Sequence, residues 1–220
     1  MPLAHLVEVA QEPVSTVVRN WQRRQPPTSQ LEMGLPSLTT HRVTLRELTV
    51  ADAPSLCAHL STEDVQRYIA PAPTTLAGFE VFIQWVRRER RAGRFLCFGI
   101  VPRGHERAVG VLQAWPIDPT FDVAEVGISL GSAFWGTGVF PDSARLFLTY
   151  MFDTLGVHRL EGRAARSNLR GNAAVRKLGA VEEGVLRKCF RLHGDYLDHV
   201  LWAILADDWR RRPNGDTSHR

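Results

Sequence analysis

The chain has few cysteines and no long apolar run. Its 220 residues contain three cysteines, Cys57, Cys97 and Cys189, which have neither the spacing of a zinc site nor the even number that disulfide pairing needs. Residues 1–10 lack the basic start and unbroken apolar stretch of a signal peptide, and no apolar run approaches membrane-spanning length. We therefore expect a cytoplasmic protein with no metal site and no membrane partner.

Two common nucleotide-binding motifs are also missing. No Gly-Lys-Ser/Thr is present, which argues against a nucleoside-triphosphate loop, and Pro141 stands where a dinucleotide-binding Gly-x-Gly-x-x-Gly needs its third glycine. The formal net charge is only +4, and the arginine clusters at 87–91 and 210–212 are typical of solvated helix ends. Nucleic acid is therefore not the expected partner, although RNA binding by these arginines is an alternative that salt dependence would reveal.

What the chain does contain is enough apolar content, 44%, for one substantial core. The prolines of residues 1–38 predict an N-terminal extension that is either poorly ordered or strapped onto the domain. Residues 39–207 form the expected domain, and 208–220 a basic C-terminal tail. The periodicity predicts helices at 53–60, 76–86, 142–155 and 171–178, and strands at 42–48, 95–101, 108–115, 123–130, 158–164, 181–192 and 196–205.

The most informative stretch is 125–142, where an apolar strand runs through a turn containing Gly136 and Gly138 into an amphipathic helix. A helix start leaves backbone N–H groups unpaired, and glycines let an anion approach them closely. The stretch therefore predicts a pyrophosphate held by backbone amides. The alternative is a tight turn that needs glycine for its positive φ angles.

Residues 125–142, followed by 163–168 and 176–180, resemble the GCN5-related N-acetyltransferase (GNAT) superfamily, and within it the ribosomal-protein N-terminal acetyltransferase (RimJ/RimL-like) branch. The resemblance covers roughly residues 41–206. It implies an α/β (α+β) fold with a mixed, mostly antiparallel sheet of about seven strands flanked by helices. It further implies that a splayed strand pair binds acetyl-CoA as cosubstrate, and that the acetyl group passes to an amine.

The resemblance also implies which residues bind the cofactor. Trp135 occupies the Arg/Gln position of the superfamily's phosphate motif, so backbone amides are expected to do most of the binding, with Arg145 either adding a charge or lying at the surface. Asn168 matches the motif's asparagine, while a helix cap is its alternative and is favoured for Asn172. The expected cofactor-binding residues are Ile128, Ser129, Leu130, Trp135, Gly136, Thr137, Gly138, Val139, Phe140, Asn168 and Asn172.

For catalysis, an amine must lose a proton and a thiolate must gain one. Glu125 stands at the matching acidic position of the superfamily strand and is the first candidate for the base, directly or through water, with Asp122 the next. A backbone N–H near Leu130 is expected to polarise the thioester carbonyl. Gly171 and Val175 take the places of the usual serine and tyrosine acids, so the proton donor is left open.

The predicted function is acetyl-CoA-dependent N-acetylation of a primary amine by direct attack in a ternary complex. A protein N-terminal α-amine is the first acceptor considered, and His193, Tyr196, Asp198 and His199 are placed near the acceptor. Alternatives are an antibiotic, polyamine or amino-acid acetyltransferase, or a noncatalytic acyl-CoA-binding or interaction module on the same fold. The partners are then acetyl-CoA and an amine-bearing protein or small molecule, with a homodimer left open.

Overall fold

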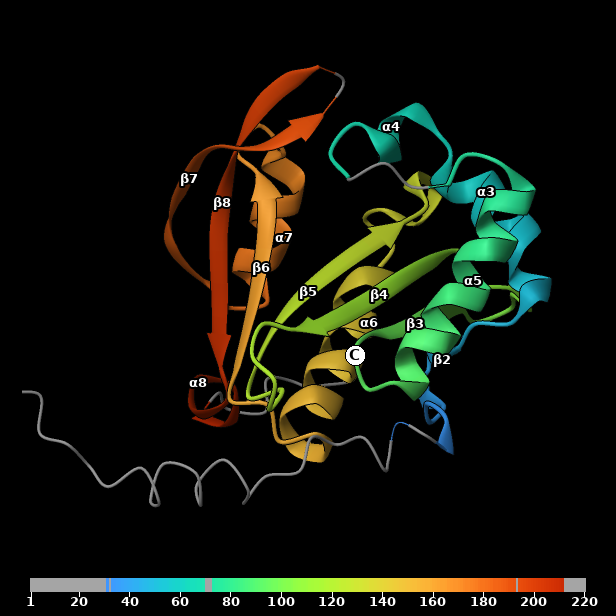
Figure 1. Cartoon of the computed structure of the whole chain (residues 1–220), viewed down its shortest axis with the longest axis horizontal. Coiled ribbons are helices and arrows are strands. Elements are labelled where there is room, and N and C mark those ends of the chain that lie inside the picture. The colour runs from blue at the N-terminus through green and yellow to red at the C-terminus, as the bar shows by residue number, and fades with distance from the viewer. Residues whose placement is uncertain (1–30, 32, 70–72, 193, 212–220) are drawn as a thin grey trace, which may run out of the picture.

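The computed structural model describes residues 31, 33–69, 73–192 and 194–211. Its strands form one eight-stranded sheet of order β1-β2-β3-β4-β5-β6-β8-β7 (Figure 1). The strands are β1 Leu38–Thr39, β2 Val43–Glu47, β3 Leu96–Pro102, β4 Gly110–Pro116, β5 Val123–Leu130, β6 Arg159–Ala165, β7 Val181–Leu192 and β8 Asp195–Leu205. Among these, β5 and β6 are parallel and the other neighbours are antiparallel. The expected mixed, mostly antiparallel sheet is confirmed, and the additional strand is the two-residue β1.

Helices cover both faces of the sheet (Figure 1). They are α3 Ala53–Leu60, α4 Glu63–Gln66, α5 Leu76–Arg91, α6 Val139–Thr149, α7 Leu169–Lys177 and α8 Ala206–Arg211, with short 3-10 turns at Val50–Asp52 and Ser132–Phe134. Alternate residues of β3 point to opposite faces. Cys97 packs in a cluster with Ile83 of α5, whereas Phe98 packs in a second cluster with Phe147 of α6. The sheet therefore lies between α3 and α5 on one face and α6 on the other.

The helix after the glycine turn differs from the predicted 142–155 at both ends. It begins at Val139, because Gly138 has a left-handed φ of 89° that turns the chain directly into the helix. Pro141 fits in this first turn, where its missing N–H would have no helical partner. After Thr149 the chain widens into a π turn over Tyr150–Thr154, which buries three consecutive side chains before Gly156 ends it.

The predicted terminal segments fall largely outside the described residues. Within the extension expected over 1–38, Leu31 is fully buried, and its carbonyl accepts a hydrogen bond from Arg90 of α5. Arg90 also donates to Glu47 at 2.7 Å. In the tail expected over 208–220, α8 continues to Arg211, and residues 212–220 lie outside the described residues. His193 of the last hairpin also lies outside them.

Among the described helices, none combines the length and the apolar character that crossing a bilayer requires.

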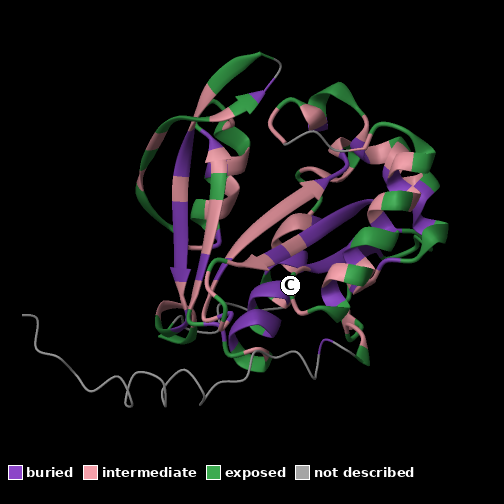
Figure 2. Cartoon of the chain, viewed as in Figure 1, coloured by how far each residue is buried: buried purple, intermediate pink, exposed green. Residues whose placement is uncertain are grey.

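The feature that positions the site is the divergence of β5 from β6. Their pairing runs from Val123 opposite Arg159 to Val126 opposite Gly162, and beyond that point the two strands separate (Figure 1). Most residues of β5 and β6 are intermediate in exposure, whereas those of β3 are fully buried (Figure 2). Partly exposed strands in the middle of a sheet mark an opening between them.

Candidate functional site

The backbone of β5 presents polar groups to this opening. Gly131 donates its N–H to the carbonyl of Val109, and Ser129 lies opposite Val111 in the antiparallel pairing with β4. Backbone groups alternate in direction along a strand, so those of Ile128 and Leu130 point away from β4 and toward the opening. The carbonyl of Leu130 already accepts a hydrogen bond from the indole of Trp135 at 2.9 Å.

The glycine turn lies next to the end of β5. Gly136 and Gly138 have positive φ angles of 77° and 89°, and a Cβ atom added to Gly136 would meet nothing within 4 Å. Thr137 donates its hydroxyl to the carbonyl of Phe134 at 2.7 Å, which holds the turn closed. The two glycines therefore fit both interpretations of the sequence. They adopt the positive φ angles of a tight turn, and they leave the backbone amides at the start of α6 open to an anion. The residues present fit a phosphate group.

Glu125 lies where the two strands begin to diverge. Its Oε1 is 3.5 Å from Nε of Arg163 on β6, and its neighbour in the β5–β6 register is Glu161. Burial raises the pKa of Glu125, Arg163 opposes that shift, and the negative charge of Glu161 adds to it. On the same face, a Cβ added to Gly127 would be in ordinary van der Waals contact with the Trp115 ring at 3.6 Å, so glycine leaves this face without a side chain of its own.

Asp122, the other acidic candidate, lies just before β5, at the closed end of the strand pair. Its carbonyl accepts the N–H groups of His158 and Arg159, at 2.8 and 3.1 Å, and so joins the starts of β5 and β6. It precedes Glu125 by three residues, or about 10 Å along an extended strand. The structure therefore does not bring Asp122 to the opening with Glu125.

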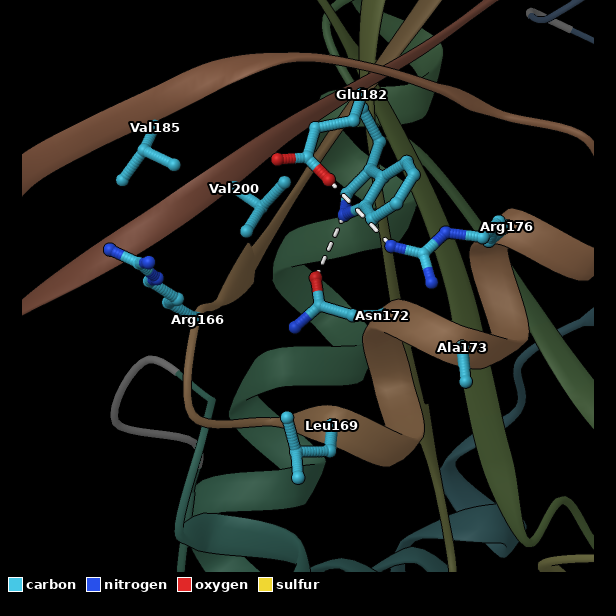
Figure 3. Close-up of a pocket in the computed structure, with 9 residues that line it drawn as sticks. Arg166, Leu169, Asn172, Ala173, Arg176, Glu182, Val185 and Val200 are labelled. Carbon is cyan, nitrogen blue, oxygen red and sulfur yellow. Dashed lines mark hydrogen bonds and ion pairs between the residues drawn. The ribbon is translucent and has the colours of Figure 1, made fainter.

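The two asparagines occupy different places in α7. Asn168 is the cap, because its Oδ1 accepts the N–H of Gly171 at 2.9 Å, so α7 begins earlier than the predicted residue 171. Asn172 is not a cap. Its Nδ2 donates to the carbonyls of Ala165 and Asn168, and its Oδ1 accepts the indole N–H of Trp202 at 2.8 Å (Figure 3). These contacts fix the start of α7 against β6 and β8.

A pocket of about 280 Å³ opens beside this network (Figure 3). It is lined by Arg166, Leu169, Asn172, Ala173, Arg176, Glu182, Val185, Val200 and Trp202. Neither Glu125 nor any residue of the glycine turn belongs to this lining. The pocket therefore lies outside the place where the predicted catalytic and phosphate-binding groups meet.

The last hairpin carries His199 on β8, the strand that pairs with β6. His199 lies opposite Ala165 of β6, is 7% exposed, and its Nε2 has no hydrogen-bond partner among the described residues. Burial lowers its pKa, and the positive charge of Arg163 lowers it further. Asp198 instead accepts the backbone N–H of Lys188 at 2.8 Å, and Tyr196 is exposed.

Residues that the sequence patterns did not single out also reach the site. Arg163 pairs with Glu125 across the strands. Arg42, just before β2, lies beside the glycine turn, and Arg170 of α7 stacks on Trp135. These contacts join positions far apart in the chain, so no local pattern signals them.

The sequence and fold of this chain are similar to those of known acetyltransferases. The model of the GNAT acetyltransferase domain matches residues 42–181. An uncharacterized N-acetyltransferase, p20 of Bacillus licheniformis, is 26% identical over 174 residues, covering 79% of this chain and 98% of that protein. The ribosomal protein uS5-alanine N-acetyltransferase of Escherichia coli is 23% identical over 134 residues, covering 60% and 69%. The structure of Mycobacterium smegmatis RimJ in complex with CoA-disulfide has a TM-score of 0.70 at 23% identity, covering 79% and 87%, and shows the same fold.

Proposed function

The chain belongs to the GNAT acetyltransferase family and is an acetyltransferase, and on this premise we propose that it transfers the acetyl group of acetyl-CoA to a protein N-terminal α-amine. The observation that carries the proposal is the opening between β5 and β6 beside the glycine turn. One end of this opening offers amides for phosphates, and its edge offers the backbone of Ile128 and Leu130 to the amides of pantetheine. Acetyl-CoA supplies the activated thioester, and the chain supplies binding and proton transfer.

Glu125 is the proposed proton acceptor for the amine. An α-amine has a pKa of about 8 and is mostly protonated at neutral pH, so a base must take its proton before attack. Burial raises the pKa of Glu125 toward the pKa of the amine, and the positive charge of Arg163 acts in the opposite direction by favouring the carboxylate. The N–H of Leu130 faces the opening and is the proposed donor to the thioester carbonyl. Backbone amides of residues 136–140, with Ser129, complete the proposed binding set. The side chain of Asn168 instead caps α7, and that of Asn172 holds this helix against β6 and β8.

A protein acceptor is supported by the family branch. One relative is named for acetylating an alanine of a ribosomal protein, and Gly127 puts no side chain of its own on the strand face that carries Trp115 and Glu125. A peptide panel tests the assignment. Peptides with free N-terminal alanine or serine should be acetylated, and the same peptides with blocked N-termini should not. Transfer to polyamines or free amino acids, with no transfer to peptides, would identify a small-molecule enzyme instead.

The cofactor is tested by calorimetric titration with acetyl-CoA. The parent should bind, and Gly138→Leu should not, because a side chain there is strained at φ 89° and meets Arg42 at 3.3 Å. Gly156→Leu is the matched control, since Gly156 has a φ of 71° at the far end of the helix and a Cβ added there would meet nothing within 4 Å. If the parent does not bind, the noncatalytic interaction module becomes the better description.

The role of Glu125 is tested by Glu125→Gln. Loss of a general base lowers the rate by about 10²–10⁴-fold, while the affinity for acetyl-CoA should be unchanged because the side chain lies on the acceptor face. In the parent, kcat/KM should rise with pH as Glu125 and the amine lose their protons. In the variant, the part of this rise that is due to deprotonation of Glu125 should disappear. Full activity of Glu125→Gln would remove Glu125 from the mechanism.

A further inference from the structure

The glycine turn carries no cation of its own. Between residues 134 and 142 the one charged side chain is Asp142, which is negative. The first position of the superfamily's phosphate motif is taken by Trp135, whose single donor is already bonded to the carbonyl of Leu130. A doubly charged pyrophosphate placed on this turn would therefore meet amides and an acid, without a positive side chain from the turn itself.

Arg42 brings a positive charge to one side of the turn. Its Nε is 3.3 Å from Oδ2 of Asp142, and its Nη1 lies 3.3 Å from the point where a Cβ of Gly138 would stand. The side chain is 52% exposed, so the guanidinium faces solvent as well as the turn. It neutralises the acid at the start of α6 and retains N–H groups that can reach an anion there.

Arg170 brings a second charge from another element. It is the second residue of α7, and its guanidinium carbon is 4.6 Å from the centre of the Trp135 ring. A guanidinium that lies over an aromatic ring keeps N–H groups that can still donate hydrogen bonds to an anion. Trp135 thus acts as a platform that holds the arginine next to the glycine turn.

We propose that Arg42 and Arg170 together supply the cationic contacts to the phosphates of coenzyme A that the turn lacks. This inference rests on the proposed function, because it concerns the same cofactor site. Trp135 is then a positioning residue. It stands at the arginine position of the motif because the positive charge comes from Arg170 of α7, which the indole holds in place.

The test measures binding of CoA itself, so that it does not depend on an acceptor. Calorimetric titrations compare the parent with Arg42→Gln, Arg170→Gln and Trp135→Ala, after thermal unfolding has shown that each variant is folded. Each arginine variant should bind CoA about tenfold more weakly, as expected for the loss of one charge-assisted contact. The differences should shrink at high salt because salt screens exposed charges. Arg91→Gln, an exposed arginine at the end of α5, is the control and should bind like the parent.

Two double variants separate phosphate contact from indirect effects. If Arg42 served only to neutralise Asp142, Arg42→Gln combined with Asp142→Asn would regain the parent's affinity, and the role of Arg42 would be overturned. If Trp135 acts through Arg170, the Trp135→Ala and Arg170→Gln double variant should bind no more weakly than the worse single variant. Parent-like affinity in both arginine variants would overturn the inference while leaving the proposed function intact. A parent that does not bind CoA would instead refute the proposed function.

Discussion

Asp52 offers the most quantitative test of the structure, because its carboxylate ties together three segments that support the site. It is fully buried at the start of α3. Both oxygens accept hydrogen bonds from Arg46 of β2 at 2.8 Å, and one also accepts the N–H of Thr49 at 2.8 Å. The other accepts the N–H of Ala108 at 3.1 Å, which fixes the turn between β3 and β4. The perturbation is Asp52→Asn, which keeps the shape and removes the charge.

The magnitude follows from the pKa of Asp52. Burial alone would raise this pKa, but the hydrogen bonds from Arg46, Thr49 and Ala108 outweigh it and lower the pKa from 3.8 to about 2. A group whose pKa is lower in the folded state stabilises the fold above its unfolded pKa and loses that contribution as pH falls through the folded pKa. The lower pKa of Asp52 in the folded state therefore contributes about 2 kcal/mol to the free energy of unfolding at pH 7 and about 1 kcal/mol at pH 3. An amide facing donors adds a pH-independent cost of about 1–2 kcal/mol.

The assay is urea unfolding of the parent and Asp52→Asn between pH 7 and pH 3. The variant should lose about 3–4 kcal/mol of unfolding free energy at pH 7, and the gap should narrow by about 1 kcal/mol at pH 3. Asp153→Asn is the control, because Asp153 is half exposed and its ion pair with Arg210 is loose at 3.7 Å. A gap that stays constant with pH would refute the electrostatic reasoning, since it would show that the charge of Asp52 contributes nothing.

Two further predictions concern the acceptor face and the start of α7. Gly127→Leu should raise the KM for a peptide acceptor by about tenfold or more, because its side chain would cover the face that carries Trp115 and Glu125, while calorimetry should show unchanged affinity for CoA. Equal KM values would show that the acceptor does not use this face. Asn172→Ala should lower the free energy of unfolding by about 2–3 kcal/mol, because it leaves the buried indole N–H of Trp202 without its partner. Denaturant unfolding measures this, and Asn172→Ala with Trp202→Phe should recover part of the loss, since the unpaired donor is then gone.

Local sequence patterns were enough to predict the fold class, the order of most elements and the location of the glycine turn. These depend on local chemistry. Alternation of apolar residues predicts strands such as 123–130, and a glycine followed by an apolar helical pattern predicts where α6 starts, although the actual start at Val139 depends on the left-handed φ of Gly138. The family resemblance carried by the same stretch was confirmed by the match over residues 42–181.

Which residues share the site depends instead on contacts between distant segments of the chain. Arg163, Arg42 and Arg170 reach Glu125 and the glycine turn from separate elements, and such contacts depend on strand register and helix packing rather than on spacing along the chain. The same is true of Asn172, whose partner Trp202 is thirty residues away. Local patterns predict the secondary structure that a segment can form. The charge around a bound phosphate depends on the side chains of every segment that the fold places near the phosphate.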